Sequence, residues 1–350
     1  MKHTHKRILS IFAAATLSVC SLSQGTPQLL RLAITASAAD TSGTCGENLT
    51  WTLDSSGKLT ISGTGSMDNW TYERDAPWHA YRADITKLVI ENGVTSIGGN
   101  AFSSCTNLPE IEFPESIHTI GVYAFQRCSK LTNVMIPWNV TSIEAWAFCE
   151  CSNLESITIM NYNCTITANS QTICNEVIDD YTQNDRSPFR GTIYGYSGST
   201  ADKYAHYAIF SKPFSALAKP TSGSWDDNIS WEYQNGTLKV SGNGDIQDAK
   251  HGGPMWSIYQ DEAENIVIAD GITGIGADVF KRFEKITDLI LPDSVTKIGD
   301  NAYESCSGLK TAVIPKNVNQ IGNYAFFDCS SLESVTIPKN VTSIGTAAFN

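Results

Sequence analysis

The chain has 350 residues, a formal net charge of −12 and 17% charged residues. Hydrophobic residues make up 41% of it and aromatic residues 10%, which is enough for packed cores and excludes wholesale disorder. So acidic a chain repels phosphate groups, which argues against binding to nucleic acid and against docking on anionic lipid.

Residues 1–39 are predicted to be a signal peptide. Three basic residues within the first seven precede an apolar run at 8–19, which is too short to span a bilayer in the usual way. Small residues at 36–39 form a predicted cleavage site, so the mature chain would begin at Asp40. A retained anchor and a lipid on Cys20 remain open as alternatives. No later stretch has 18 consecutive apolar residues, so no membrane span is expected in the mature chain.

Two β-hairpin caps are expected, at 40–84 and 223–263. The stretch GTCGENLTW at 43–51 matches GSWDDNISW at 223–231, and both regions contain hairpin turn signals, Ser-Gly in the first and Asn-Gly in the second. A cap of this kind covers a sheet edge that would otherwise pair with other chains.

A repeat of 23 residues follows each cap. An Ala-Phe pair and its close variants mark the start of each unit: Ala101-Phe102, Ala124-Phe125, Ala147-Phe148, Val279-Phe280, Ala302-Tyr303, Ala325-Phe326 and Ala348-Phe349. A leucine or isoleucine recurs six residues after the aromatic position: Leu108, Leu131, Leu154, Ile286, Leu309 and Leu332. The repeats place one solenoid at 85–175 and a second at 264–350.

Each unit also carries the signals of a short strand between two corners. Alternating apolar residues such as Val134 and Ile136 are typical of a strand with one buried face. A proline after the strand forces a corner, and a glycine before the next unit permits another. One coil cannot bury enough surface alone, so the units must stack. The predicted fold is a mainly β solenoid in two tandem capped modules.

The first module is expected to end in an exit segment at 176–217, and a linker at 218–222 follows it. Ser199 and Asp202 form a capping box that opens a short helix, which Ala205, Tyr207 and Ala208 would dock on the last coil. The second module stops at Asn350, directly after a new Ala-Phe pair, so we expect the natural protein to continue.

The repeat unit resembles the BspA-type bacterial leucine-rich repeat. The resemblance is carried by A-F-x-x-C-x-x-L-x-x-(I/V)-x-I-P-x-x-V-x-x-I-G, which is most complete from Ala325 to Gly345. The first cap is similar to those that precede such repeats in secreted proteins of Firmicutes. The resemblance implies a leucine-rich-repeat solenoid in secreted or surface-exposed proteins that bind other proteins or cell surfaces, and it supplies no catalytic residues.

Cysteines recur at one position of the repeat: Cys105, Cys128, Cys151, Cys306 and Cys329. Phe283 takes that position once, so we interpret it as an apolar ladder inside the solenoid. A disulfide between neighbouring coils or a metal site is the lesser alternative. Outside the ladder, Cys164 and Cys174 are candidates for a disulfide.

No catalytic constellation is visible. The six histidines are scattered, and the chain has no zinc-protease, nucleophile-elbow, phosphate-loop or dinucleotide motif. We therefore expect no enzyme and no cofactor.

Aromatic residues at outward positions are the candidate binding surface: Tyr123, Trp138, Trp146 and Tyr324. Exposed aromatic residues often mark recognition. For the two tryptophans the alternative is that segment 160–215 folds back and covers them.

These observations predict a secreted or cell-surface, adhesin-like, non-catalytic protein that binds a protein or glycan on another cell or matrix. The alternative is an accessory module of a larger exported peptidase or glycosidase whose catalytic or anchoring part lies beyond Asn350.

Overall fold

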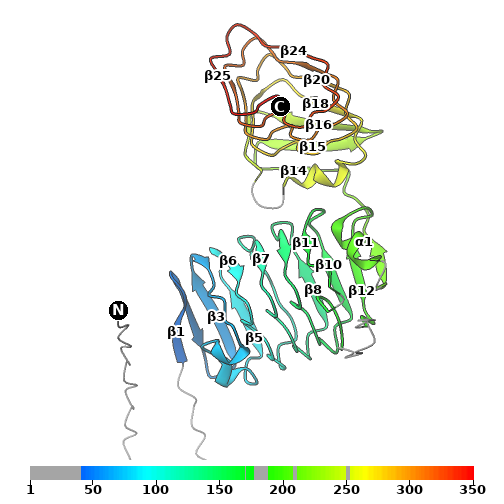
Figure 1. The fold of residues 1–350 in the computed structure, drawn as a ribbon. Coiled ribbons are helices and arrows are strands. Elements are labelled where there is room, and N and C mark those ends of the chain that lie inside the picture. The colour runs from blue at the N-terminus through cyan, green and yellow to red at the C-terminus, as the bar shows by residue number, and fades with distance from the viewer. Residues whose placement is uncertain (1–40, 170, 177–187, 208–210, 250–252) are drawn as a thin grey trace, which may run out of the picture. The chain divides into compact units, whose positions relative to one another are not determined.

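The computed structural model describes residues 41–169, 171–176, 188–207, 211–249 and 253–350 (Figure 1). The predicted signal peptide at 1–39 lies outside this part of the chain, as do Cys20 and Ala208. Within it, short strands predominate and helices are few, which confirms the mainly β fold.

The first cap is a three-stranded antiparallel meander of β1 (Thr41–Gly46), β2 (Leu49–Leu53) and β3 (Lys58–Gly63). Strand β3 then pairs in parallel with β5 (Lys87–Ile90). Two 3-10 helices, η1 (Glu73–Asp75) and η2 (His79–Tyr81), lie between them in sequence. The cap therefore changes the chain from antiparallel to parallel pairing and shares its last strand with the repeats.

The repeats after this cap form two parallel sheets. One sheet contains β4 (Gly65–Ser66), β6 (Val94–Ile97), β7 (Thr119–Ile120), β9 (Ser142–Ile143) and β11 (Thr165–Ile166). The other contains β8 (Asn133–Ile136), β10 (Ser156–Ile159), β12 (Thr192–Gly195) and β13 (Phe214–Ala216). Partners such as Thr119 and Ser142 lie one repeat apart in the sequence. The row of strands is visible in Figure 1.

One expected strand is missing. Ile111 is buried and Phe113 is partly buried, as the pattern predicts, but no strand is assigned to residues 107–114. Pro109 stands where the next coil has Thr132 and cannot donate a backbone N–H to a neighbouring strand. Pairing is interrupted between β5 and β8.

Each coil turns at the predicted corners. The carbonyl of Pro137 accepts a hydrogen bond from the Val140 N–H at 3.2 Å, and Pro315 and Val318 repeat this contact at 3.1 Å. Backbone hydrogen bonds also link neighbouring coils along the Ala-Phe edge, where the Phe102 N–H donates to the Ala124 carbonyl at 2.8 Å.

A column of stacked rings fills the interior. Phe102 and Phe125 lie 5.3 Å apart between centroids, and Phe125 and Phe148 lie 5.5 Å apart. Trp78 of the cap begins this column by stacking on Phe102 at 5.4 Å. Beside the rings, the leucines at 108, 131 and 154 are all buried, as the period predicts.

The second set of repeats has the same plan. Its cap is β14 (Ser222–Ser224), β15 (Ile229–Gln234) and β16 (Thr237–Gly242), which pairs in parallel with β18 (Asn265–Ile268). Its other strands are β17 (Gly244–Ile246), β19 (Ile272–Ile275), β21 (Lys297–Ile298), β23 (Gln320–Ile321), β25 (Ser343–Ile344), and β20 (Asp288–Ile290), β22 (Thr311–Val313), β24 (Ser334–Thr336). The 3-10 helix η3 (Met255–Tyr259) carries Trp256, which begins the second column by stacking on Phe280 at 6.0 Å.

The segment expected as an exit continues the solenoid sheet. Strands β12 and β13 extend it in parallel, although the sequence around β12 predicts turns. The helix α1 (Thr200–Ala205) begins after Ser199, whose side chain accepts a hydrogen bond from the Asp202 N–H as predicted. Tyr207, which was expected to help dock the helix, is 44% exposed. Ala201, Tyr204 and Ala205 are the buried residues of the helix.

Candidate binding surface

Two predicted surface aromatics occupy equivalent places on neighbouring coils. Tyr123 has φ 58° and Trp146 has φ 67°, the left-handed conformation that Asn100 adopts one coil earlier. The N–H of Tyr123 donates to the Ala145 carbonyl at 3.2 Å, which fixes its backbone against the next coil. The two rings meet edge to face, with centroids 4.9 Å apart.

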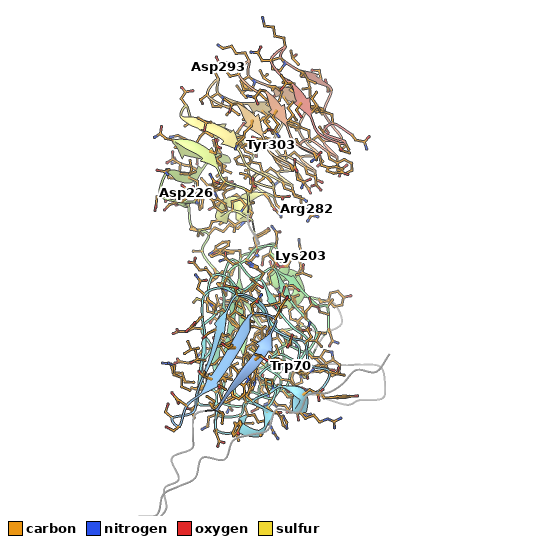
Figure 2. All side chains as sticks on the ribbon, turned by 90° about the vertical axis from the view of Figure 1, so that its left-hand side faces the viewer. Trp70, Lys203, Asp226, Arg282, Asp293 and Tyr303 are labelled. Atoms are coloured by element: carbon orange, nitrogen blue, oxygen red, sulfur yellow. The ribbon has the colours of Figure 1, made fainter. Side chains whose placement is uncertain are left out.

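A surface groove of about 650 Å³, which we call the aromatic groove, lies beside this pair. Its apolar wall consists of Trp70, Val122 and Tyr123. Val122 is 39% exposed, and Trp70 is partly buried with its ring edge-on to Trp78 at 5.4 Å. Figure 2 labels Trp70 beside the first cap. The groove thus joins the cap to the first coils of the solenoid.

Hydrogen bonds hold the Trp70 side of the groove in place. The Trp70 N–H donates to the Gly99 carbonyl at 3.1 Å, and the side-chain oxygen of Asn69 accepts from the Gly99 N–H at 2.7 Å. The Asn100 side-chain amide donates to the Trp70 carbonyl at 2.7 Å. The Trp70 backbone is therefore fixed before any ligand arrives.

The polar lining of the groove is acidic and hydroxyl-rich. Ser96 and Thr119 present hydroxyls from adjacent strands, and Glu144 is the one acid among the lining residues, which include no lysine or arginine. Partial burial, and to a lesser extent nearby Cys149, raises the pKa of the Tyr123 phenol above its ordinary value. Its hydroxyl therefore stays protonated and can donate.

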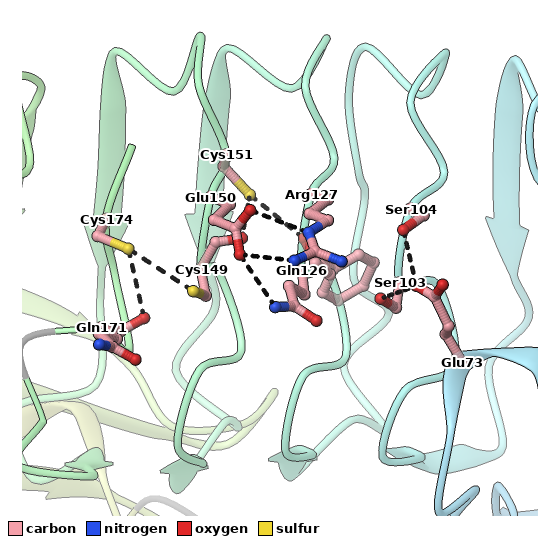
Figure 3. Close-up of polar contacts among 11 residues, drawn as sticks. Glu73, Ser103, Ser104, Gln126, Arg127, Cys149, Glu150, Cys151, Gln171 and Cys174 are labelled. Carbon is pink, nitrogen blue, oxygen red and sulfur yellow. Dashed lines mark hydrogen bonds and ion pairs between the residues drawn. The ribbon is translucent and has the colours of Figure 1, made fainter. Parts of the chain in front are cut away.

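Charged residues near the groove are engaged with neighbouring coils (Figure 3). Arg127 and Glu150 form an ion pair at 2.9 Å, and Glu73 accepts hydrogen bonds from Ser103 and Ser104. Partial burial works against the charged form of Glu73, but the bonds from Ser104 and Ser103 hold its pKa below the usual value.

A second hollow, of about 410 Å³, lies at the last coil and is lined by Leu332, Val335 and Phe349. One coil earlier the residues equivalent to the first two, Leu309 and Ala312, are buried. This hollow is therefore the interior of a coil rather than a ligand site.

The groups expected of an enzyme are not gathered in the described ranges. No cluster of three or more His, Cys, Asp or Glu residues there could hold a metal ion. His79 lies 2.9 Å from an Arg82 nitrogen, and His206 pairs with Asp202 within α1. His251 falls outside the described residues.

Comparison with known proteins identifies the repeat. The model of the BspA type leucine rich repeat region matches six copies, at residues 79–182 and 257–350, which is more than half of the chain. The chain belongs to the BspA-type leucine-rich repeat family. No match was found among curated proteins.

Solved structures of bacterial leucine-rich repeat proteins are also similar to this BspA-type protein. A leucine-rich repeat protein from Eubacterium ventriosum is 17% identical, with 89% of this chain and 95% of that chain covered and a TM-score of 0.34. A leucine rich cell surface protein from Faecalibacterium prausnitzii is 18% identical, with 86% and 95% covered and a TM-score of 0.28. The pneumococcal vaccine antigen PcpA is 15% identical, with 87% and 85% covered and a TM-score of 0.31.

The predicted surface aromatics of this BspA-type protein separate into different environments. Trp138 stacks on Tyr196 at 5.5 Å, so the 160–215 segment does reach it. Tyr324 is 41% exposed, has φ 54° and lies edge-on to Phe327 in the second set of repeats. Tyr123 and Trp146 alone among the four lie together.

The cysteine ladder is buried throughout, with a contact that the apolar interpretation did not include. The Cys128 thiol donates to the Phe102 carbonyl at 3.3 Å, and the Cys306 thiol donates to the Phe280 carbonyl at 3.2 Å. Burial raises the pKa of Cys105 and of Cys151 to about 12. These thiols are therefore protonated at neutral pH and serve structure.

The described cysteines are all free thiols in this structure, and no contact between Cys164 and Cys174 is recorded among them. The sulfur of Cys174 lies 3.8 Å from that of Cys149 instead. Cys149 lies outside the ladder position of the repeat and is fully buried.

Sequence-based reasoning also missed three residues of the aromatic groove, namely Trp70, Val122 and Glu144. Trp70 lies outside the 23-residue period, so no repeat column includes it. Glu144 did break the glycine pattern at its position, where Gly121 stands one coil earlier, and that break was the available signal.

Proposed function

We propose that this BspA-type protein is a secreted or cell-surface binding protein without catalytic activity, and that its ligand lies along the aromatic groove. The observation that carries the proposal is that Trp70 and Tyr123 line one surface hollow, with the ring of Trp146 edge-on to that of Tyr123. The signal-like segment at 1–39 and the family support an extracellular location. Within the described residues, no helix is long and apolar enough to cross a membrane.

The groove suits an extended ligand. Tyr123 and Trp146 are one coil apart, so a chain lying along the stacking direction would meet both rings in succession. The backbone bond from Tyr123 to Ala145 fixes Tyr123 against the coil that carries Trp146, which reduces the entropy that binding must overcome. A rigid aromatic surface of this kind is typical of binding hot spots.

The chemistry of the lining favours a neutral glycan over an acidic ligand. Aromatic rings provide apolar faces, while Ser96, Thr119 and Glu144 provide hydrogen-bonding groups. The absence of lysine and arginine from the lining leaves nothing to pair with an anion. A protein ligand is the alternative outcome of the test.

Titration of neutral polysaccharides and oligosaccharides, first on an array and then by calorimetry, tests this proposal. Trp146→Ala and Tyr123→Ala should each weaken binding about ten-fold or more, because each removes a central aromatic contact. Tyr324→Ala is the matched control, since it removes an aromatic residue from the same coil position and the same left-handed backbone conformation. It should leave the affinity unchanged.

Two outcomes would overturn the proposal. One is that no neutral glycan binds saturably. The other is that Tyr324→Ala weakens binding as much as the two groove variants, because the effect would then reflect the coil position rather than the groove.

A further inference from the structure

We propose that Cys149 and Cys174 are joined by a disulfide in the exported protein, which would fasten the irregular segment after β11 to the last regular coil. Their sulfurs lie 3.8 Å apart, and both residues are fully buried (Figure 3). A disulfide needs about 2.05 Å between sulfurs, so the two must approach by about 2 Å. The inference is independent of the groove's ligand and rests only on the proposed export.

The backbone already holds the two residues side by side. Phe148 and Ile173, which directly precede them, form a parallel β-bridge. The Cys174 N–H donates to the Phe148 carbonyl at 3.3 Å, and the Cys174 carbonyl accepts from the Cys151 N–H at 3.1 Å. The contact between the sulfurs therefore follows from strand-like pairing and not from a chance approach of two side chains.

Other cysteines nearby are engaged differently. The Cys151 thiol donates to the Phe125 carbonyl at 3.2 Å, and Cys164 lies next to the Thr165 carbonyl at 3.9 Å. Cys149 is also outside the repeat column of ladder cysteines. Its partner Cys174 is in sequence register with the ladder, one repeat after Cys151, but the bridge between Phe148 and Ile173 shifts this segment so that Cys174 meets Cys149 instead.

The covalent step is thiol–disulfide exchange with a low-molecular-weight disulfide. The thiolate of Cys174 attacks one sulfur of that disulfide, which gives a mixed disulfide and releases one thiol. Cys149 then loses its proton to water and attacks the Cys174 sulfur, which releases the second thiol. Two protein thiols are oxidised to one disulfide, and the external disulfide is reduced to two thiols.

In the docked state the contact between the two thiols shifts their pKa values in opposite directions. The hydrogen bond with Cys149 holds the pKa of Cys174 below its ordinary value, while the same contact and burial raise the pKa of Cys149. Because both sulfurs are buried in the folded chain, we expect exchange to occur before this segment docks during folding.

Peptide mapping of the full chain, refolded with oxidised glutathione, tests the pairing. Cleavage after glutamate separates Cys149 (145–150) from Cys151 (151–155) and from 156–176, which holds Cys164 and Cys174. We expect 145–150 linked to 156–176 under non-reducing conditions, and the same link in Cys164→Ser. Cys174→Ser should abolish it. A free, alkylatable Cys149 after oxidation, or a link from Cys149 to any other cysteine, would overturn the proposal.

A thermal measurement adds a readout that does not depend on the peptide map. The closed loop is about 25 residues long, so oxidation should raise the melting temperature of wild type by roughly 5–15 °C. In Cys149→Ser the oxidised and reduced samples should melt together. If the oxidised and reduced samples of Cys149→Ser differed in melting temperature as much as those of wild type, the pairing would be overturned. The peptide map of protein oxidised in vitro tests the cysteine pairing alone. Detection of the protein in the culture medium tests the proposed export.

Discussion

Single residues in this protein show where the repeat tolerates exceptions. Tyr303 occupies a position that is phenylalanine in neighbouring coils, and it continues the ring column by stacking on Phe280 and on Phe326, each at 5.4 Å. Figure 2 labels it within the second set of repeats. Its hydroxyl is buried and has no hydrogen-bond partner in the part of the chain that the structure describes. Burial raises the pKa of this phenol well above its ordinary value.

Tyr303→Phe should therefore stabilise the protein. Removing a buried hydroxyl that lacks a partner recovers about 1 kcal/mol, while the ring keeps its stacking contacts. Denaturant unfolding followed by circular dichroism measures the change. Tyr204→Phe is the matched control, because the Tyr204 hydroxyl donates to the Asn169 carbonyl at 2.9 Å, and its loss should destabilise by about 1–3 kcal/mol. A destabilised Tyr303→Phe would show that the hydroxyl is satisfied.

At the scale of the coil, the buried cysteine ladder is the element with a pH-dependent consequence. Every member has a pKa above that of a free thiol because burial disfavours the thiolate, with values of about 12 for Cys105 and about 11 for Cys329. The neutral thiol also donates to a carbonyl of an adjacent coil in four of the five members. Ionisation would thus place a charge in a buried site and remove a hydrogen bond, and both effects destabilise the folded state.

The free energy of unfolding should fall as the pH rises from about 9 towards 12. A group whose pKa is higher in the folded state gives its full stability below its unfolded pKa, here about 8.5, and loses it as the pH rises towards the folded value. Each such thiol contributes a slope of up to about 1.4 kcal/mol per pH unit. Urea unfolding at pH 7, 9, 10 and 11 measures this slope, and Cys151→Ala should reduce it. An identical slope in that variant would contradict the ladder's role.

For the molecule as a whole, the described residues form two hydrophobic clusters, which follow the two sets of repeats except that Tyr162 and Tyr196 belong to the second. The period predicted this well: the Ala-Phe pairs, the leucine column and the proline corners all follow from one repeated pattern of apolar residues. Secondary-structure propensity and the alternation of apolar residues act locally. When they recur at a fixed period, the core residues can therefore be predicted from the sequence.

The sequence predicted less where contacts join segments outside the period. Trp70 reaches the groove from the cap, and Cys174 meets Cys149 from the degenerate end of the first repeats. Neither contact has the spacing of the repeat, so only the folded backbone brings these residues together. Residues 107–114 show a local limit, because apolar alternation predicted a strand there and none is formed.

Neighbouring coils share one interior. Phe125 stacks on Phe102 before it and on Phe148 after it, so Phe125→Ala should leave a cavity felt by three coils. Hydrogen-exchange mass spectrometry of this variant is the most direct measurement. We predict faster exchange in residues 101–123 and 147–159 together with 124–146, and unchanged exchange in 264–350. Faster exchange confined to residues 124–146 would contradict the shared core.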